Sequence, residues 1–258
     1  TALVLAIRAA NAIYLSRLDA LSAALEELGR TQGENPLMAR TRMQAALPIT
    51  AGHRITTWAA PVERHRARLE ALRPEGELLQ FGDIRDRAFA LHAVDTLEVG
   101  DRQRSHPHGD AITRLMATEL GLSAPERAWH TERDGLATYA SWLSALTGSL
   151  GKIGQDICLM AQQGVDALAQ QGGGSSSAMA HKQNPVTAEL LVTLARYTAG
   201  QLPLMHQAMV HEQERSGAMW TLEWMVLPAM MSSTGAALRL ATEQVHAITR
   251  IGEAPSPA

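Results

Sequence analysis

The chain has 258 residues, of which 46% are hydrophobic and 19% are charged, and its formal net charge at pH 7 is −3. This composition is ordinary for a folded globular protein and is not that of a disordered chain. The negative net charge gives no basic field for nucleic acid or for an anionic membrane surface, so we expect neither as a partner.

The first predicted element is a long amphipathic helix. Hydrophobic residues recur every three or four positions from Leu3 to Leu28, and the glycines within 29–33 supply a stop signal. The chain enters this pattern at Thr1 without a convincing helix cap, which suggests that a preceding segment is missing. No apolar run reaches about 18 residues, and the first residues lack the order of a signal peptide. The sequence therefore predicts a cytoplasmic protein.

Three more long helices are predicted further along the chain. A seven-residue hydrophobic repeat from Leu136 to Met160 predicts the second. The third should begin at Pro185 with a kink at Pro203, and the fourth should run from Gly217 to about Arg250. The single cysteine, Cys158, lies in the apolar stripe of the second helix. It excludes an internal disulfide framework, fits a reducing compartment and is interpreted as a packed thiol.

The connecting segments are less clear. Residues 81–108 have no assignable pattern, and residues 123–135 predict a short helix and a turn. No segment shows persuasive strand alternation. The predicted fold class is all-α, a long-helix bundle. We expect one domain over residues 1–250, ending in the final long helix, and a tail over 251–258.

The hydrophobic stripes are longer than one neighbouring helix can cover. Only 4% of residues are aromatic, so alanine, leucine and methionine must fill most seams between helices. Exposed seams of this size are a liability in a monomer. The pattern therefore predicts a helical core that continues across subunit boundaries.

The most informative segment, 172–185, reads Gly-Gly-Gly-Ser-Ser-Ser-Ala-Met-Ala-His-Lys-Gln-Asn-Pro. By composition alone a flexible linker is an equally good interpretation. The glycines allow a loop to open and close, the serines supply hydroxyls, and Lys182 supplies a positive charge. Asn184 before Pro185 predicts a helix N-cap with proline at the first helical position, which favours a bound anion. The segment thus predicts a loop that binds a carboxylate while a serine moves a proton.

The order of these residues resembles the signature loop of the fumarase/aspartase superfamily, Ser-Ser-x-Met-x-x-Lys-x-Asn-Pro, at residues 176–185. Ala180 stands where the family usually has proline. The resemblance implies that Ser176 is the proton-transfer serine and that Lys182 is a catalytic cation. It places four further loop residues at the substrate: Ser177, Met179, His181 and Asn184.

A second segment, 39–48, reads Ala-Arg-Thr-Arg-Met-Gln-Ala-Ala-Leu-Pro. By itself it fits the basic, capped start of a helix. It also resembles the superfamily's Thr-His-x-Gln-x-Ala-x-Pro region, which implies that Thr41, Arg42 and Gln44 bind substrate. Arg42 stands where many members have histidine. An arginine stays protonated and cannot serve as a general acid near neutral pH, but it can clamp a carboxylate by two parallel hydrogen bonds.

The third segment, 211–228, reads His-Glu-Gln-Glu-Arg-Ser-Gly-Ala-Met-Trp-Thr-Leu-Glu-Trp-Met-Val-Leu-Pro. By itself it fits a solvated charged turn followed by an aromatic-rich helix. Its order resembles 3-carboxy-cis,cis-muconate lactonizing enzymes, the cycloisomerases of protocatechuate breakdown in the beta-ketoadipate pathway. This resemblance implies that Arg215 is catalytic. It further implies closure of a polycarboxylate to a lactone without cofactor or metal, in a homotetramer whose active sites are shared between subunits.

Two other functions stay open at this point. A fumarate-releasing lyase of the adenylosuccinate lyase type has a similar signature loop, although Arg42 in place of histidine counts against it. A non-catalytic helical scaffold of the same fold is the third possibility. The histidines lack metal-ligand spacing, since His106 and His108 give only a weak hint, and His130 beside Trp129 is interpreted as packing.

Overall fold

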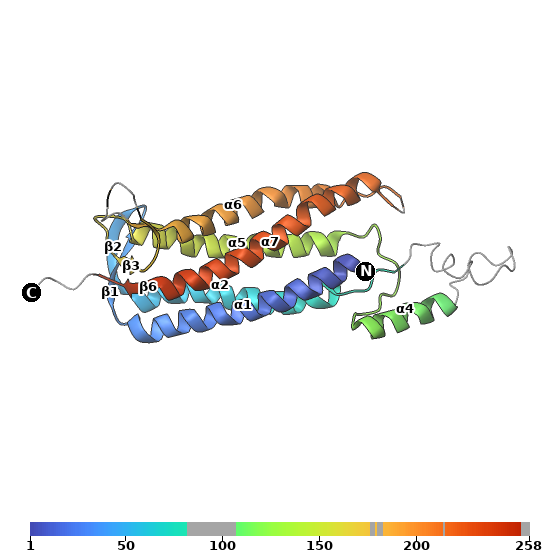
Figure 1. Cartoon of the computed structure of the whole chain (residues 1–258), viewed down its shortest axis with the longest axis horizontal. Coiled ribbons are helices and arrows are strands. Elements are labelled where there is room, and N and C mark those ends of the chain that lie inside the picture. The colour runs from blue at the N-terminus through green and yellow to red at the C-terminus, as the bar shows by residue number, and fades with distance from the viewer. Residues whose placement is uncertain (82–106, 176–178, 180–182, 214, 254–258) are drawn as a thin grey trace, which may run out of the picture.

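The computed structural model describes residues 1–81, 107–175, 179, 183–213 and 215–253. Within them, five long helices lie side by side along the longest axis of the molecule (Figure 1). A shorter helix, α4, lies near the N-terminus. The bounds are α1 Ala2–Gln32, α2 Ala51–Gly76, α4 Pro107–Leu120, α5 Asp134–Met160, α6 Val186–Gln207 and α7 Gly217–Ala247. The predicted all-α bundle is confirmed.

Six short strands gather at one end of the bundle, as three antiparallel pairs (Figure 1). They are β1 Pro36–Thr41 with β2 Gln44–Thr50, β3 Leu168–Gln170 with β6 Ile248–Ile251, and β4 Gly174–Ser175 with β5 Gln183–Asn184. We call this the hairpin end, and the opposite end, where α5 and α7 begin, the turn end. The β1–β2 hairpin is exposed on both faces over most of its length, so its sequence has no apolar alternation by which it could be predicted.

Helix α2 was not predicted, and the limits of the four predicted long helices hold with three corrections. Helix α6 begins at Val186, and Asn184 does not cap it, because the Asn184 side chain donates to the Gly174 carbonyl (3.2 Å). The short helix predicted within 123–135 is wrong, because Ser123 forms a bridge with Leu78 and the described chain has no helix between α4 and α5. Helix α7 ends at Ala247, and β6 takes the chain on to Ile251, inside the predicted tail.

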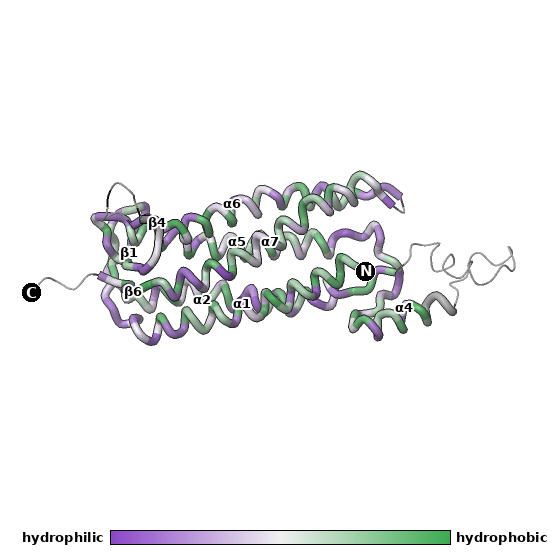
Figure 2. Tube along the Cα trace, in the orientation of Figure 1, coloured by the Kyte–Doolittle hydropathy of each residue, from purple (hydrophilic) through white to green (hydrophobic). Residues whose placement is uncertain are grey.

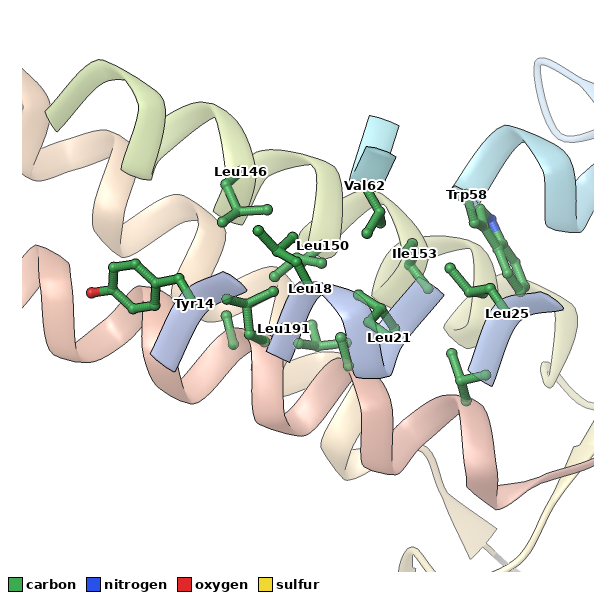
Figure 3. Packing of buried hydrophobic residues seen from close by; sticks show 14 of the residues in the cluster. Tyr14, Leu18, Leu21, Leu25, Trp58, Val62, Leu146, Leu150, Ile153 and Leu191 are labelled. Atoms are coloured by element: carbon green, nitrogen blue, oxygen red, sulfur yellow. The ribbon is translucent and has the colours of Figure 1, made fainter. Parts of the chain in front are cut away.

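The core joins α1, α2, α5, α6 and α7 through side chains spaced three or four positions apart. Figure 3 shows one level of it, where leucines of α1 meet side chains of α2, α5 and α6. Hydrophobic and hydrophilic residues accordingly alternate at turn spacing along each long helix (Figure 2). Cys158 packs half-buried against this core, and burial raises the pKa of its thiol, which agrees with a packing role. Among the described residues no helix is long and apolar enough to span a membrane.

Helices α5 and α6 approach each other through glycine. A methyl group on Gly154 would lie 2.4 Å from the Ala188 carbonyl oxygen and 2.8 Å from Cβ of Leu191. We therefore expect Gly154→Ala to lower the free energy of unfolding by about 1–3 kcal/mol through overpacking. Gly148 of the same helix has no neighbour within 4 Å of such a methyl group, so Gly148→Ala should raise it by about 0.5–1 kcal/mol. Denaturant titrations of both variants test this contrast, and equal stabilities would contradict it.

Candidate active site

The predicted site residues that the structure describes lie at opposite ends of the helical bundle. Thr41, Arg42 and Gln44 are at the tip of the β1–β2 hairpin, and Asn184 is in β5, all at the hairpin end (Figure 1). Arg215 precedes α7 at the turn end. The 27 residues of α5 separate these ends by about 40 Å, at 1.5 Å per residue. A single chain therefore does not bring Arg215 to Thr41, Arg42, Gln44 or Asn184.

At the hairpin end, Thr41 pairs with Gln44 across a two-residue turn made by Arg42 and Met43. Both turn residues have positive φ, 48° and 67°, as in a type I′ turn. The alternative interpretation of this segment as the start of a helix is wrong. The start of α2 lies further on, at Thr50, whose side chain accepts a hydrogen bond from the backbone N–H of His53 (3.3 Å).

The base of the signature loop is a second, shorter pairing at the same end. Gly174 pairs with Asn184, and Ser175 with Gln183, so the two ends of the loop lie side by side. A methyl group on Gly173, whose φ is 123°, would lie 2.7 Å from the Asn184 carbonyl oxygen, so this close approach requires glycine. Helix α6 begins directly after the loop, and its N-terminus favours a nearby negative charge.

Most of the predicted loop residues cannot be placed at this base. Ser176, Ser177, His181 and Lys182 lie outside the described residues. Met179 is described and is 43% exposed. The Asn184 side chain holds the loop base together through Gly174, a structural use that the sequence pattern does not indicate.

At the turn end, Arg215 lies between two aromatic rings. Its Nη2 is 3.2 Å from Nε2 of His130, and its guanidinium carbon is 5.4 Å from the centroid of Trp220. Since arginine can only donate, Nε2 of His130 is the acceptor in this contact. His130 packs edge-on against Trp220, with ring centroids 5.8 Å apart. The packing role predicted for His130 is thus incomplete, because the ring also positions Arg215.

A buried ion pair joins the two segments that carry this arrangement. Arg133, at the start of α5, donates two hydrogen bonds to Glu223 of α7, one of them 2.9 Å from Nε to Oε2. The side chains are only 4% and 1% exposed. Beside the pair, both ring nitrogens of His211 are buried without a hydrogen-bond partner among the described atoms. Burial, with the charge of Arg133, lowers the pKa of His211 and favours its neutral form.

The described residues contain no group of three or more histidine, cysteine, aspartate or glutamate side chains arranged to hold a metal ion. His106 lies outside the described residues, and the side chain of His108 is likewise not described. The weak metal hint from these two histidines therefore stays a prediction.

The chain resembles known proteins over nearly its whole length. A family profile described as Lyase matches residues 1–200. A 3-carboxy-cis,cis-muconate cycloisomerase from Pseudomonas aeruginosa is 35% identical over 93% of this chain and 50% of the relative. The crystal structure of 3-carboxy-cis,cis-muconate lactonizing enzyme from Pseudomonas putida matches with a TM-score of 0.83 and 33% identity, covering 97% of this chain and 53% of that one. A fumarate lyase from Mesorhizobium sp. BNC1 matches with a TM-score of 0.80 and 28% identity, over 96% and 52%. The chain thus spans about half the length of these relatives.

Proposed function

The chain belongs to the lyase family whose profile covers its residues 1–200, and from this membership we propose that the protein is a 3-carboxy-cis,cis-muconate cycloisomerase. The observation that carries the proposal is the residue order around Arg215 together with the names of the most similar curated relatives. Four 3-carboxy-cis,cis-muconate cycloisomerases are 31–38% identical over 92–93% of this chain. The order of the segment around Arg215 is that of the lactonizing enzymes.

The proposed reaction is an intramolecular addition. One carboxylate oxygen of 3-carboxy-cis,cis-muconate forms a C–O bond to a carbon of a double bond, and a proton is added to the neighbouring carbon, which gives 4-carboxymuconolactone. The substrate is a trianion, so cations must offset its charge, and we assign this role to Lys182, Arg215 and Arg42. A preplaced donor at the developing charge contributes about 10²–10³ in rate at comparable sites. Ser176 is the assigned proton-transfer residue.

Thr41 and Gln44 complete the proposed site as neutral hydrogen-bond partners, with Ser177, Met179, His181 and Asn184 from the signature loop. The proposal includes no cofactor. It places the enzyme in the cytoplasm, where the lone thiol of Cys158 stays reduced, and in protocatechuate degradation by the beta-ketoadipate pathway.

The distance between the two ends of the bundle bears on assembly. Because Arg215 and the base of the signature loop are about 40 Å apart in one chain, a site that contains both must combine different copies. We propose a homotetramer with shared active sites. Large apolar side chains exposed on α6 and α7 fit this proposal, among them Leu190, Tyr197, Trp224 and Met225.

A substrate comparison tests the proposed reaction. We expect the full-length protein to remove the ultraviolet absorbance of 3-carboxy-cis,cis-muconate, because lactone formation breaks the conjugation of the two double bonds. Unchanged absorbance would contradict the proposal. The likeness to a fumarate lyase supports a second candidate, elimination from adenylosuccinate or a similar compound, and released fumarate would identify it. Inactivity towards every compound tested would favour the third possibility, a non-catalytic helical scaffold.

A further inference from the structure

A cavity of about 210 Å³ lies at the base of the signature loop, where α7 ends and α6 begins (Figure 1). Gly172 and Gly173 line it where the chain enters the loop, and Thr187 lines it from the first turn of α6. Glu243 and Gln244 line it from the end of α7. Pockets for drug-sized ligands measure about 300–1,000 Å³, so this cavity suits a smaller molecule.

The wall of the cavity is polar and negatively charged. It includes the side-chain amides of Gln170, Gln171 and Gln244. The described lining residues include no arginine, lysine or histidine, and Glu243 is the one charged residue among them. Nε2 of the buried Gln244 donates to Oε1 of Gln170 (2.5 Å), which leaves Oε1 of Gln244 to accept from a ligand. A wall of this kind favours a cation that carries N–H donors.

The surroundings of Glu243 agree with a cationic ligand. Its Oε1 accepts from Nη1 of Arg239 (2.6 Å), one turn earlier in α7, and both side chains are 53% exposed. Exposed pairs of this spacing contribute little stability, so a ligand can compete with Arg239 for the carboxylate. The last turn of α7 adds a partial negative charge. The first turn of α6 has the opposite sign, but it already contains Glu189, the negative charge that this helix end favours.

A neighbouring cavity at the hairpin end has the opposite charge. It lies beneath the β1–β2 hairpin and is lined by Arg40, Arg42 and Arg54, with Asp156 as its carboxylate among the described residues. The described linings of the two cavities share no residue. A polycarboxylate is attracted to the arginines and repelled by Glu243. The cavity at the loop base is therefore unsuited to the proposed substrate.

We propose that the cavity at the loop base binds a small organic cation of the guanidinium or primary ammonium class, and that this ligand holds the loop base in place. The cation donates to the carboxylate of Glu243 and to Oε1 of Gln244. It also contacts Gly172 and Gly173, which precede the β4–β5 pairing. The backbone N–H of Gln171 donates to the Ala247 carbonyl (2.8 Å), so the loop entry is already joined to the end of α7. A bound cation adds a second connection between them.

Calorimetric titration of the full-length protein with methylguanidinium chloride tests the proposal. Glu243→Gln removes the charge but keeps the shape of the side chain, and should weaken binding about tenfold or more. Arg239→Gln removes the competing guanidinium and should strengthen binding about twofold. Both variants break the same surface ion pair, so a general effect on folding would change both in one direction. In the wild type, methylguanidinium should also slow hydrogen exchange of the backbone amides of β4 and β5.

Four results would overturn the proposal. The first is wild-type affinity for methylguanidinium in the Glu243→Gln protein. The second is equally tight binding of tetramethylammonium, a cation without N–H donors, which would remove the hydrogen bonds from the interaction. The third is acetate binding at this cavity in place of the cation. The fourth is unchanged hydrogen exchange in β4 and β5, which would remove the connection to the loop. These measurements involve no substrate, so their outcome is independent of whether the protein is a cycloisomerase.

Discussion

Replacing Arg215 with alanine is expected to lower kcat/KM for 3-carboxy-cis,cis-muconate by about two to three orders of magnitude. The guanidinium is exposed, and His130 and Trp220 hold it in one orientation. A planar, oriented guanidinium binds a carboxylate by two parallel hydrogen bonds, and a trianionic substrate needs such a partner. Steady-state kinetics, followed by the loss of substrate absorbance, measures the effect.

Two further variants make this test specific. Arg127 lies in the segment that connects α4 to α5 and pairs with Glu132 on the surface, so Arg127→Ala removes an equal charge and should leave kcat/KM near the wild-type value. Arg215→Lys keeps the charge but loses the planar fork and its stacking on Trp220, and should recover only part of the activity. An Arg215→Ala enzyme with wild-type kcat/KM would remove Arg215 from the mechanism.

Four of the five long helices, α1, α5, α6 and α7, were predicted because each buries one continuous face, whereas α2, which contains Pro61 and Pro74, was not predicted. Leu18, Leu21 and Leu25 of α1 are fully buried and spaced as a helix requires, and Leu143, Leu146 and Leu150 repeat this in α5. This spacing involves only residues near one another in the chain, so it can be recognised from the sequence alone. The β1–β2 hairpin has no buried face of that kind, and its turn residues, Arg42 and Met43, are not those that normally mark a type I′ turn.

The candidate site was predictable as motifs but not as an arrangement. The signature loop and the segment around Arg215 are contiguous in sequence, and their residue order is informative without coordinates. The contact between His130 and Arg215 joins positions 85 residues apart, and it exists because α5 and α7 begin at the same end of the bundle. The same geometry sets Arg215 far from Thr41 and Gln44 of its own chain, which no local pattern reveals.

The buried ion pair of Arg133 and Glu223 should be the polar contact whose loss lowers the free energy of unfolding most. Glu223→Ala is expected to lower the free energy of unfolding by about 3–5 kcal/mol, because it leaves the charge of Arg133 buried without its partner. Denaturant titrations at one fixed protein concentration measure this, since any association of subunits makes stability depend on concentration. A loss below about 1 kcal/mol, the range of a surface pair, would mean that water reaches Arg133.

The double variant Arg133→Met/Glu223→Leu separates the cost of an unpaired charge from the value of the pair itself. Replacing both buried charges with apolar side chains of similar size is often neutral for stability, so most of the lost free energy should return. The apolar pair cannot reproduce the two directed hydrogen bonds that fix the start of α5 against α7. We therefore expect the double variant to have a higher KM than the wild type even where its stability has recovered, because His130 would no longer hold Arg215 in place. Recovery of both quantities together would show that the ion pair only stabilises the fold.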